Sequence, residues 1–315
     1  MSNPNKRASS ARRAAEKKSI AKERVKAKAF AKTDKKRDAQ KKYFKKKNAG
    51  SLEQNIYDSD NISSSRSKKQ GKVEKAYKLV AAQEGVSNAQ GKSMIDRGLV
   101  YVGNKKVMIA RGELPLDTEF KIQRVEKIKP IFEDNDLAVV NKPAFINSDE
   151  VERQFKGARL LHRLDRETSG VLMLVKNEEF REKAIRAFKN DEVYKEYVAW
   201  VDGVFTEEII VDKAIITEKR HNKAYSKVSK QGKPARSEVY PLEVSGKKSK
   251  VKVIIHEGRT HQIRTHLRSI GFPITGDELY GGSRFHRVML HAKKVILMGR
   301  TFEAAEPKIF SHFSE

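Results

Sequence analysis

A run of five apolar residues, 171–175, constrains the fold of this chain more than any other segment. Gly170 precedes the run, and the polar pair Lys176 and Asn177 follows it, which is typical of a short strand buried in a core. The string of residues 162–170 leads directly into this strand and contains four charged side chains. Because a buried strand is rigid, the sequence predicts that side chains at its entrance point in fixed directions.

Asp165 lies between Arg163 and Arg166 in this string. An opposite charge nearby favours the ionised form of a carboxyl group. An ionised carboxylate can act as a nucleophile towards a carbon atom of a sugar or a base. A salt bridge that merely flanks a strand would place the same residues there without any chemistry, and it is the alternative interpretation.

The nine residues 162–170 resemble the signature of the RluA-type pseudouridine synthases, in which the aspartate is the catalytic nucleophile. Further segments resemble other blocks of that family, and together they span most of residues 131–292: residues 131–143, 195–203, 256–266, 276–282 and 290–292. After Lys142 and Pro143 the family often has a glycine and an apolar residue, whereas this chain continues with Ala144, Phe145 and Ile146. This departure concerns the shape of the loop and not the chemistry.

The resemblance also implies roles for Tyr197 and Arg264. Tyr197 follows Asp165 by 32 residues, a spacing that fits the family, and its ring would pack against a flipped uracil while its hydroxyl helps to move protons. An extruded base needs an aromatic face to stack on. Arg264 matches the arginine that pairs with the aspartate. Without the family spacing, a tyrosine in an alternating strand would usually be part of the core.

Four other side chains are candidate contacts with the substrate. Arg163 would fill the stack that the flipped base leaves, and Arg259 would contact an RNA phosphate. Leu290 would form a wall against the base, although it could equally be an ordinary core leucine. Arg166 belongs to the same set because it lies beside Asp165.

The implied reaction is the isomerisation of uridine to pseudouridine within RNA: the base is detached at its nitrogen, turned, and rejoined through carbon 5. This reaction is redox-neutral and hydrolyses nothing, so neither a cofactor nor a metal is expected. The sequence has no glycine-rich dinucleotide loop. His256, His261 and His266 are spaced by five residues, so they would not share one face of a helix as zinc ligands do.

A small RNA-binding domain is predicted at residues 74–127. Ser87 and Gln90 have the spacing of a capping box that begins a helix, and Gly98 is placed to end it. A hairpin is predicted over residues 100–108, with a turn at Gly103 and Asn104. This order is similar to the domain named after ribosomal protein S-four, although any short module of helices and strands could share it. Its expected phosphate contacts are Lys92, Arg97, Lys105, Lys106 and Arg111.

The first 73 residues are predicted to be a basic arm and linker. The whole chain of 315 residues has a net charge of +26, and residues 1–50 alone contain 19 Lys and Arg against 4 Asp and Glu. Such an arm has too few apolar residues to fold alone, so it is expected to be disordered and to become helical on RNA. A merely solubilising tail is the alternative. The charge pattern predicts a nucleic-acid partner.

We therefore expect an α+β protein in which residues 128–315 form a catalytic domain around a mixed, mostly antiparallel sheet. Strand patterns at residues 197–201 and 251–255 alternate with helix patterns at residues 181–189 and 262–270. The chain has no cysteine, no apolar run long enough to span a membrane and no apolar signal core, so a cytoplasmic location without membrane contact is expected.

Structured RNA is the expected partner, and large-subunit (23S) ribosomal RNA or a bacterial pre-ribosomal particle is the first expectation. The protein is expected to be a monomer. A transfer-RNA substrate is left open. A ribosome-binding or assembly factor with a non-catalytic synthase fold is an alternative function. A carboxylate-based nucleosidase is a third, but it would need a second positioned acid or base.

Overall fold

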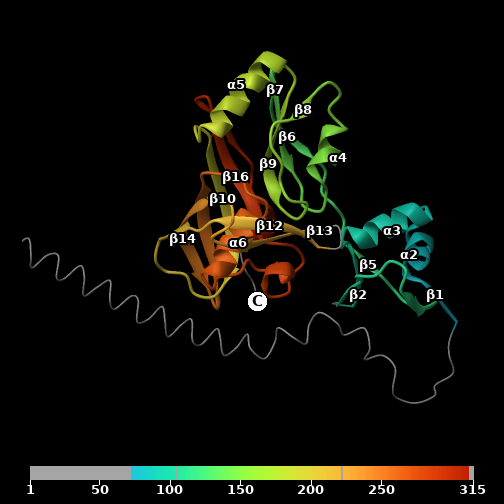
Figure 1. Cartoon of the computed structure of the whole chain (residues 1–315). Coiled ribbons are helices and arrows are strands. Elements are labelled where there is room, and N and C mark those ends of the chain that lie inside the picture. Colours follow the sequence, from blue (N-terminus) through green and yellow to red (C-terminus); the bar gives the residue numbers. More distant parts are fainter. Residues whose placement is uncertain (1–71, 104, 221–222, 312–315) are drawn as a thin grey trace, which may run out of the picture. The chain divides into compact units, whose positions relative to one another are not determined.

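The computed structural model describes residues 72–103, 105–220 and 223–311, and its central element is strand β9 (Ser169–Val175). All seven residues of β9 are buried, which confirms the strand predicted from the apolar run. Strand β7 (Leu137–Lys142) pairs with it in antiparallel orientation, and strand β16 (Leu290–Leu297) pairs with it in parallel (Figure 1). The parallel register joins only His291 to Ser169 and Ala292 to Gly170.

The other strands of this sheet are β6 (Lys129–Glu133), β8 (Arg159–Leu160), β10 (Tyr194–Asp202), β11 (Ile209–Asp212), β14 (Arg236–Ser245), β15 (Lys248–Ile255) and β17 (Arg300–Glu303). The strand order is β11-β14-β15-β10-β16-β9-β7-β6, with β17 beside β16 and β8 beside β9. Among the described residues, every pairing in this ten-stranded sheet is antiparallel except that of β9 with β16. The predicted α+β fold with a mixed, mostly antiparallel sheet is confirmed.

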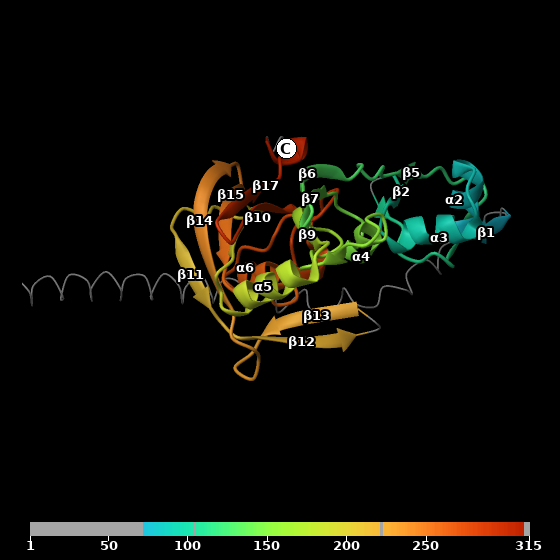
Figure 2. The same ribbon diagram turned by 90° about the horizontal axis from the view of Figure 1, so that it is seen from above.

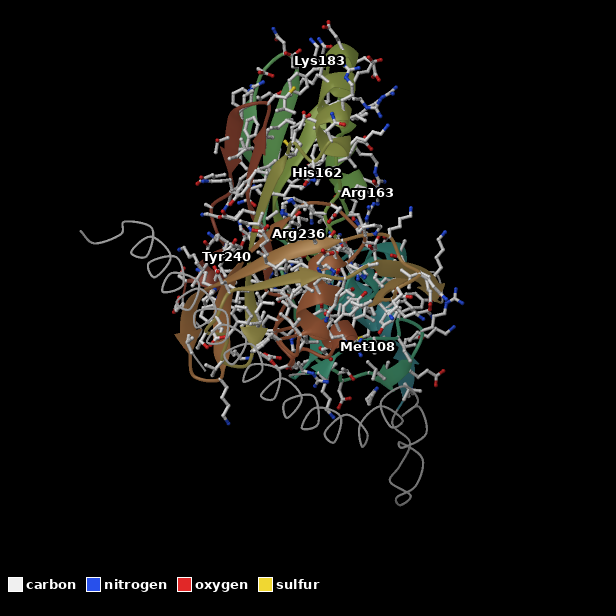
Figure 3. All side chains as sticks on the ribbon, turned by 60° about the vertical axis from the view of Figure 1, so that its left-hand side comes forward. Met108, His162, Arg163, Lys183, Arg236 and Tyr240 are labelled. Carbon is white, nitrogen blue, oxygen red and sulfur yellow. The ribbon has the colours of Figure 1, made fainter. Side chains whose placement is uncertain are left out.

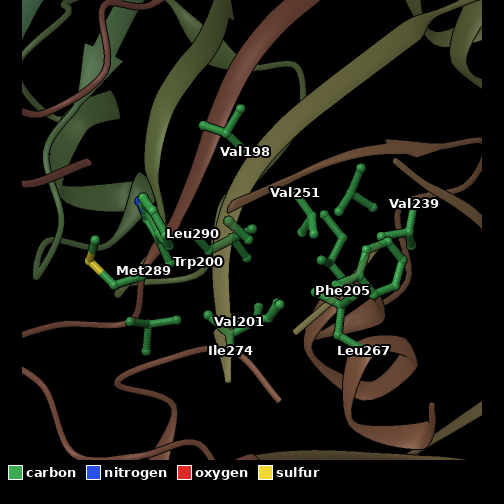
Figure 4. Packing of buried hydrophobic residues seen from close by; sticks show 14 of the residues in the cluster. Val198, Trp200, Val201, Phe205, Val239, Val251, Leu267, Ile274, Met289 and Leu290 are labelled. Atoms are coloured by element: carbon green, nitrogen blue, oxygen red, sulfur yellow. The ribbon is translucent and has the colours of Figure 1, made fainter. Parts of the chain in front are cut away.

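One half of the sheet contributes to a core around Trp200 (Figure 4). Strand β15 alternates strictly between buried and half-buried residues, so Val251 and Val253 point into this core. Helix α6 (Gln262–Ser269) adds Leu267 to the same cluster. The indole Nε1 of Trp200 donates to the carbonyl of Phe310 at 3.1 Å, which satisfies the only polar atom of that buried ring. This core fixes α6 against the sheet.

A second core lies between β7, β9 and helix α5 (Glu178–Lys189). Helix α5 begins where the Asn177 side chain accepts hydrogen bonds from the backbone N–H groups of Glu179 and Phe180. Ala184 and Ala187 face the sheet, and small residues there let the helix approach β9 closely. The helices predicted at residues 181–189 and 262–270 thus correspond to α5 and α6.

Two strands outside the large sheet, β12 (Ile215–Arg220) and β13 (Lys223–Val228), pair with each other, and Ile215 also forms an isolated bridge with Lys233. Figure 2 shows them side by side. The short helices among residues 128–311 are α4 (Ser148–Glu152), η1 (Glu278–Tyr280) and η2 (Lys308–Phe310). Tyr280 of η1 reaches back to β13, where its hydroxyl accepts a hydrogen bond from the backbone N–H of Ser226 at 2.8 Å.

Residues 73–122 form the smaller elements β1 (Val73–Lys75), α2 (Ala76–Glu84), α3 (Asn88–Asp96), β2 (Val100–Val102), β3 (Lys105–Lys106), β4 (Glu113–Pro115) and β5 (Lys121–Ile122). The capping box of Ser87 and Gln90 is confirmed at the start of α3, and Gly98 has the left-handed φ of +72° expected after the helix. The hairpin is confirmed by the pairing of β2 with β3.

The described residues fall within one compact unit, so the predicted boundary between residues 127 and 128 stays a prediction. The likeness of residues 74–127 to the S-four domain also stays a prediction. The predicted basic arm and linker lie outside the described residues, except for Lys72 and Val73. Of the helices in the described ranges, none combines the length and the apolar character needed to cross a membrane.

Replacing Gly170 with alanine is expected to destabilise the fold, because an added Cβ would lie 2.1 Å from the Ala292 carbonyl oxygen on β16. Gly157→Ala is a matched control: Gly157 also has a positive φ, +80°, but its added Cβ meets nothing within 4 Å. Denaturant unfolding should show a loss of about 1 kcal/mol for the control, from backbone strain alone. The loss for Gly170→Ala should be about 3 kcal/mol or more. Equal losses would contradict the close contact of β9 with β16.

Candidate active site

Asp165 lies in the loop between β8 and β9, and hydrogen bonds on both sides hold the backbone of this loop. The N–H of the buried Leu164 donates to Ser148 Oγ at 3.0 Å, and the Leu164 carbonyl accepts from the same hydroxyl at 3.1 Å. The N–H of Thr168 donates to the carbonyl of Asp165 at 3.1 Å, which closes a turn. The half-buried carboxylate of Asp165 is therefore presented from a fixed backbone.

Lys142 supports the same loop from inside the protein. Its fully buried Nζ donates to the carbonyl oxygens of Pro143 and Ile146, both at 2.9 Å, and to that of Arg166 at 3.4 Å. Burial lowers the pKa of Lys142 to about 7. Phe145 has a φ of +71°, and its N–H donates to the Arg166 carbonyl at 2.7 Å. The loop that departs from the family pattern is thus tied to the Asp165 loop.

Arg264, on α6, connects Asp165 to a second carboxylate. Its NH1 donates to Asp165 Oδ2 at 3.3 Å, while its Nε and NH2 donate to the two oxygens of Asp277 at 2.7 and 2.8 Å. The side chains of Arg264 and Asp277 are only 5% and 1% exposed. Burial opposes the charge of Arg264, but the hydrogen bonds and charge of Asp277 outweigh it and raise the pKa of the guanidinium above its usual value. Arg264 is therefore a permanent cation with a fixed direction.

Tyr197, on β10, faces the same space. Burial and the negative charge of Asp165 raise the pKa of the Tyr197 hydroxyl above its usual range. The phenol therefore keeps its proton at neutral pH and can donate a hydrogen bond. Its ring packs against two apolar clusters, one around Trp200 and one that contains Leu172 and Leu174, so the ring plane is fixed.

A pocket of about 70 Å³ brings together six of the seven residues predicted to catalyse or to hold the substrate. They are Arg163, Asp165, Tyr197, Arg259, Arg264 and Leu290. Aromatic, apolar and charged groups thus converge on one space, which is the composition expected of a site for a nucleobase. The role of each residue stays a prediction.

Comparison with known proteins agrees with this arrangement. The family model of RNA pseudouridylate synthases matches residues 136–269. A Helicobacter pylori protein described as an uncharacterized RNA pseudouridine synthase is 50% identical over 241 residues, which are 76% of this chain and 99% of that protein. The chain belongs to the RNA pseudouridine synthase family.

More distant relatives extend the comparison. The ribosomal large subunit pseudouridine synthase D of Pasteurella multocida is 26% identical, over 62% of this chain and 69% of its own length. The solved structure of human RNA pseudouridylate synthase domain containing 1 matches with a TM-score of 0.51 at 30% identity, over 59% of this chain and 85% of the human chain. The resemblance to the RluA-type synthases is confirmed, and the protein is an RNA pseudouridine synthase by class.

The arginines of the synthase differ in how firmly they are held. Arg163, labelled in Figure 3, has an exposed side chain. It lines the pocket and pairs with Asp149 at 3.2 Å. Arg259 donates from Nε to the carbonyl of Pro234 at 3.0 Å. Arg166 does not line the pocket, because it pairs with Glu167 at 2.8 Å and donates to the carbonyl of Asp96 at 2.9 Å.

The five residues predicted to contact RNA phosphates lie on or near α3 and the β2–β3 hairpin. Lys105 and Arg111 are exposed, and Lys106 lies 5.8 Å from the ring centroid of Tyr101. Lys92 pairs with Asp96 on the same helix. Arg97 is held more firmly, since its Nε donates to the carbonyl of Phe145 at 2.9 Å and its NH2 lies 3.6 Å from Glu150.

The three histidines considered as metal ligands have different partners. His256 bridges Asp191 and Glu238, at 2.8 and 3.0 Å. His266 contacts the hydroxyl of Ser237 and the carbonyl of Lys213. In the described ranges, no group of three or more His, Cys, Asp and Glu side chains is placed to hold a metal ion.

Sequence analysis did not identify three residues around Asp165: His261, Asp277 and Tyr280. Asp277 and Tyr280 belong to the closing stretch that resembles the family, but nothing in the pattern indicated what they contact. His261 lies three residues before Arg264, and its Nε2 is 3.8 Å from Asp165 Oδ2. For His261, the signal that the sequence offered is its position three residues before Arg264. No sequence signal indicated the contacts of Asp277 and Tyr280.

Asp277→Asn is expected to destabilise the synthase by about 3–5 kcal/mol, because it leaves the buried Arg264 with half of its compensating charge. Asp149→Asn is the matched control, since it removes the carboxylate of an exposed aspartate–arginine pair. That control should cost at most about 1 kcal/mol. Thermal and denaturant unfolding of both variants would measure the difference. Similar losses would show that Arg264 does not depend on Asp277.

Proposed function

We propose that this chain isomerises specific uridines to pseudouridines in large-subunit (23S) ribosomal RNA, by a cofactor-free mechanism that depends on Asp165 and on flipping of the target base. The observation that carries the proposal is that Asp165, Arg264 and Tyr197 meet in one pocket of a pseudouridine synthase fold. Relatives named ribosomal large subunit pseudouridine synthases support ribosomal RNA as the substrate. The positive net charge of +26 supports an RNA partner.

In the proposed reaction, the bond between the sugar C1′ and the base N1 breaks, the uracil turns, and a bond from C1′ to C5 replaces it. The C5 proton leaves and N1 gains a proton, so atoms and electrons balance without any other reactant. The ionised Asp165 assists the departure of the base, and Arg264 holds its carboxylate. The ring of Tyr197 stacks on the uracil, and its protonated hydroxyl donates to it.

Flipping costs a few kcal/mol, because the target base loses its stack and its pairing. Arg163 is suited to offset part of this cost, since its side chain is 68% exposed and pairs with Asp149 at the surface. A guanidinium plane can replace a base in a stack. Positive charge elsewhere on the protein would add affinity that falls as salt rises.

Asp165→Asn is expected to abolish pseudouridine formation while leaving the fold and RNA binding in place. Chemical mapping of pseudouridine across total RNA should compare cells with the wild-type gene, a deletion, and this variant. The same one or few uridines of 23S ribosomal RNA should lose modification in both altered strains. Loss of modification confined to transfer RNA would show that the substrate is transfer RNA and not 23S ribosomal RNA. Identical maps, together with a growth defect in the deletion that Asp165→Asn rescues, would favour an assembly factor.

Tyr197→Phe tests the hydroxyl separately from the ring. The variant keeps the stacking face, so KM should change little, while kcat should fall by about 100-fold if the hydroxyl moves a proton. Tyr194→Phe is a matched control on the same strand, because the Tyr194 hydroxyl donates to Glu196 at 2.6 Å and does not line the pocket. Equal kcat values for wild type and Tyr197→Phe would show that the hydroxyl moves no proton and that Tyr197 acts through its ring alone.

A further inference from the structure

We propose that His261 is a positioning residue for the Asp165 carboxylate, and that Tyr280 selects the imidazole tautomer that can donate to it. This inference rests on the proposed function and deepens it. His261 Nδ1 lies 2.8 Å from the Tyr280 hydroxyl, and His261 Nε2 lies 3.8 Å from Asp165 Oδ2. The imidazole therefore stands between a tyrosine and the nucleophile.

The hydrogen bonds of Tyr280 decide which nitrogen of His261 carries the proton. The Tyr280 hydroxyl accepts a hydrogen bond from the N–H of Ser226 at 2.8 Å, so its own proton is free to be donated. The hydroxyl of Thr265 also forms a hydrogen bond with the Tyr280 hydroxyl. With Ser226 and Thr265 both donating to the Tyr280 oxygen, His261 Nδ1 is the acceptor for the Tyr280 proton. Burial raises the pKa of Tyr280, so it stays a donor at neutral pH. Nδ1 thus accepts, and the imidazole proton lies on Nε2 and faces Asp165.

A tautomer matters only for a neutral imidazole, because the charged form has a proton on both nitrogens. The charged and titratable groups around His261 are Asp165, Glu167, Arg264, Asp277 and Tyr280. Burial lowers the pKa of His261 and outweighs the attraction of Asp165. The ring is therefore neutral at neutral pH, and the tautomer that Tyr280 selects determines whether His261 can donate to Asp165.

The backbone conformation of His261 is unusual, and it supports a functional orientation of the imidazole toward Asp165. His261 has a φ of +53°, a left-handed conformation that is uncommon for a residue with a side chain. It directly precedes α6, and its ring meets the Tyr280 ring edge-on at a centroid distance of 5.5 Å. A strained backbone that aims a side chain at the catalytic carboxylate is a reason to infer function.

His261 and Arg264 both approach the same oxygen of Asp165. Arg264 NH1 lies 3.3 Å from Asp165 Oδ2, and His261 Nε2 is a second nitrogen near that oxygen. The distance of 3.8 Å is too long for a hydrogen bond in the free protein, and such contacts commonly shorten when substrate binds. In the described part of the chain no donor addresses Oδ1, so Oδ1 is the oxygen that faces the substrate.

The first test needs no substrate. Nitrogen-15 labelling of the eight histidines, with His261 assigned by its absence in His261→Gln, reports the tautomer from the chemical shifts of the ring nitrogens. The expected result is a neutral ring with the proton on Nε2, which becomes a mixture or moves to Nδ1 in Tyr280→Phe. A proton on Nδ1 in the wild-type protein would overturn the proposal, whatever the activity proves to be.

The second test uses two amides that mimic the two nitrogens. The amide nitrogen of His261→Gln can occupy the place of Nε2, so this variant should lose less than about fivefold in kcat. His261→Asn tolerates the left-handed backbone but reaches only the place of Nδ1, so kcat should fall about 100-fold with KM nearly unchanged. Equal losses in the two variants, each shown to be folded by its melting temperature, would contradict the proposal.

A double-variant comparison separates tautomer selection from structural support. Tyr280→Phe should lower kcat about tenfold in the wild-type background, but much less in His261→Gln, because an amide has no tautomer to select. Full additivity of the two effects would show that Tyr280 acts independently of His261. If the wild-type protein forms no pseudouridine in any RNA, the proposed function fails, while the nitrogen-15 measurement still decides the tautomer.

Discussion

The buried pair of Arg264 and Asp277 is the interaction on which the site depends. Two short hydrogen bonds from one guanidinium to one carboxylate fix the plane of Arg264, and its remaining nitrogen then has one direction in which to reach Asp165. Removing Asp277 would leave Asp165 as the remaining carboxylate contact of the buried guanidinium, and removing Arg264 would leave the buried Asp277 without this partner. Because α6 carries Arg264 and the turn into η1 carries Asp277, the pair also fastens two chain segments to each other.

The backbone around Asp165 is held in a different way, by hydrogen bonds from buried side chains to backbone carbonyl oxygens. Lys142 Nζ binds carbonyls of residues 143, 146 and 166, and Arg287 NH2 donates to the carbonyls of Glu167 and Leu290. Burial lowers the pKa of Arg287 to about 10. These buried donors satisfy the carbonyls of residues 143, 146, 166 and 167, which lie in loops outside the strands. Rigid loops on both sides of Asp165 are the result.

Much of the fold could be predicted because its signals are local. The apolar run gave β9, the spacing of Ser87 and Gln90 gave the start of α3, and Gly98 gave its end. The positions of Asp165, Tyr197 and Arg264 around one pocket could be expected only through resemblance to a family, since they come from three distant segments. The firm anchoring of Arg97 and Arg166 could not be predicted, because the carbonyls they contact lie 48 and 70 residues away in the chain.

The sequence by itself determined which chemical groups are present, roughly where several strands and helices lie, and to which family the chain belongs. Periodicity, capping and turn residues act over a few positions, so they can be recognised without coordinates. Only the tertiary structure decided that Asp277 holds Arg264, that Tyr280 contacts His261, and that β9 runs parallel to β16. These choices depend on contacts between segments that packing brings together, and no local pattern encodes such a partner.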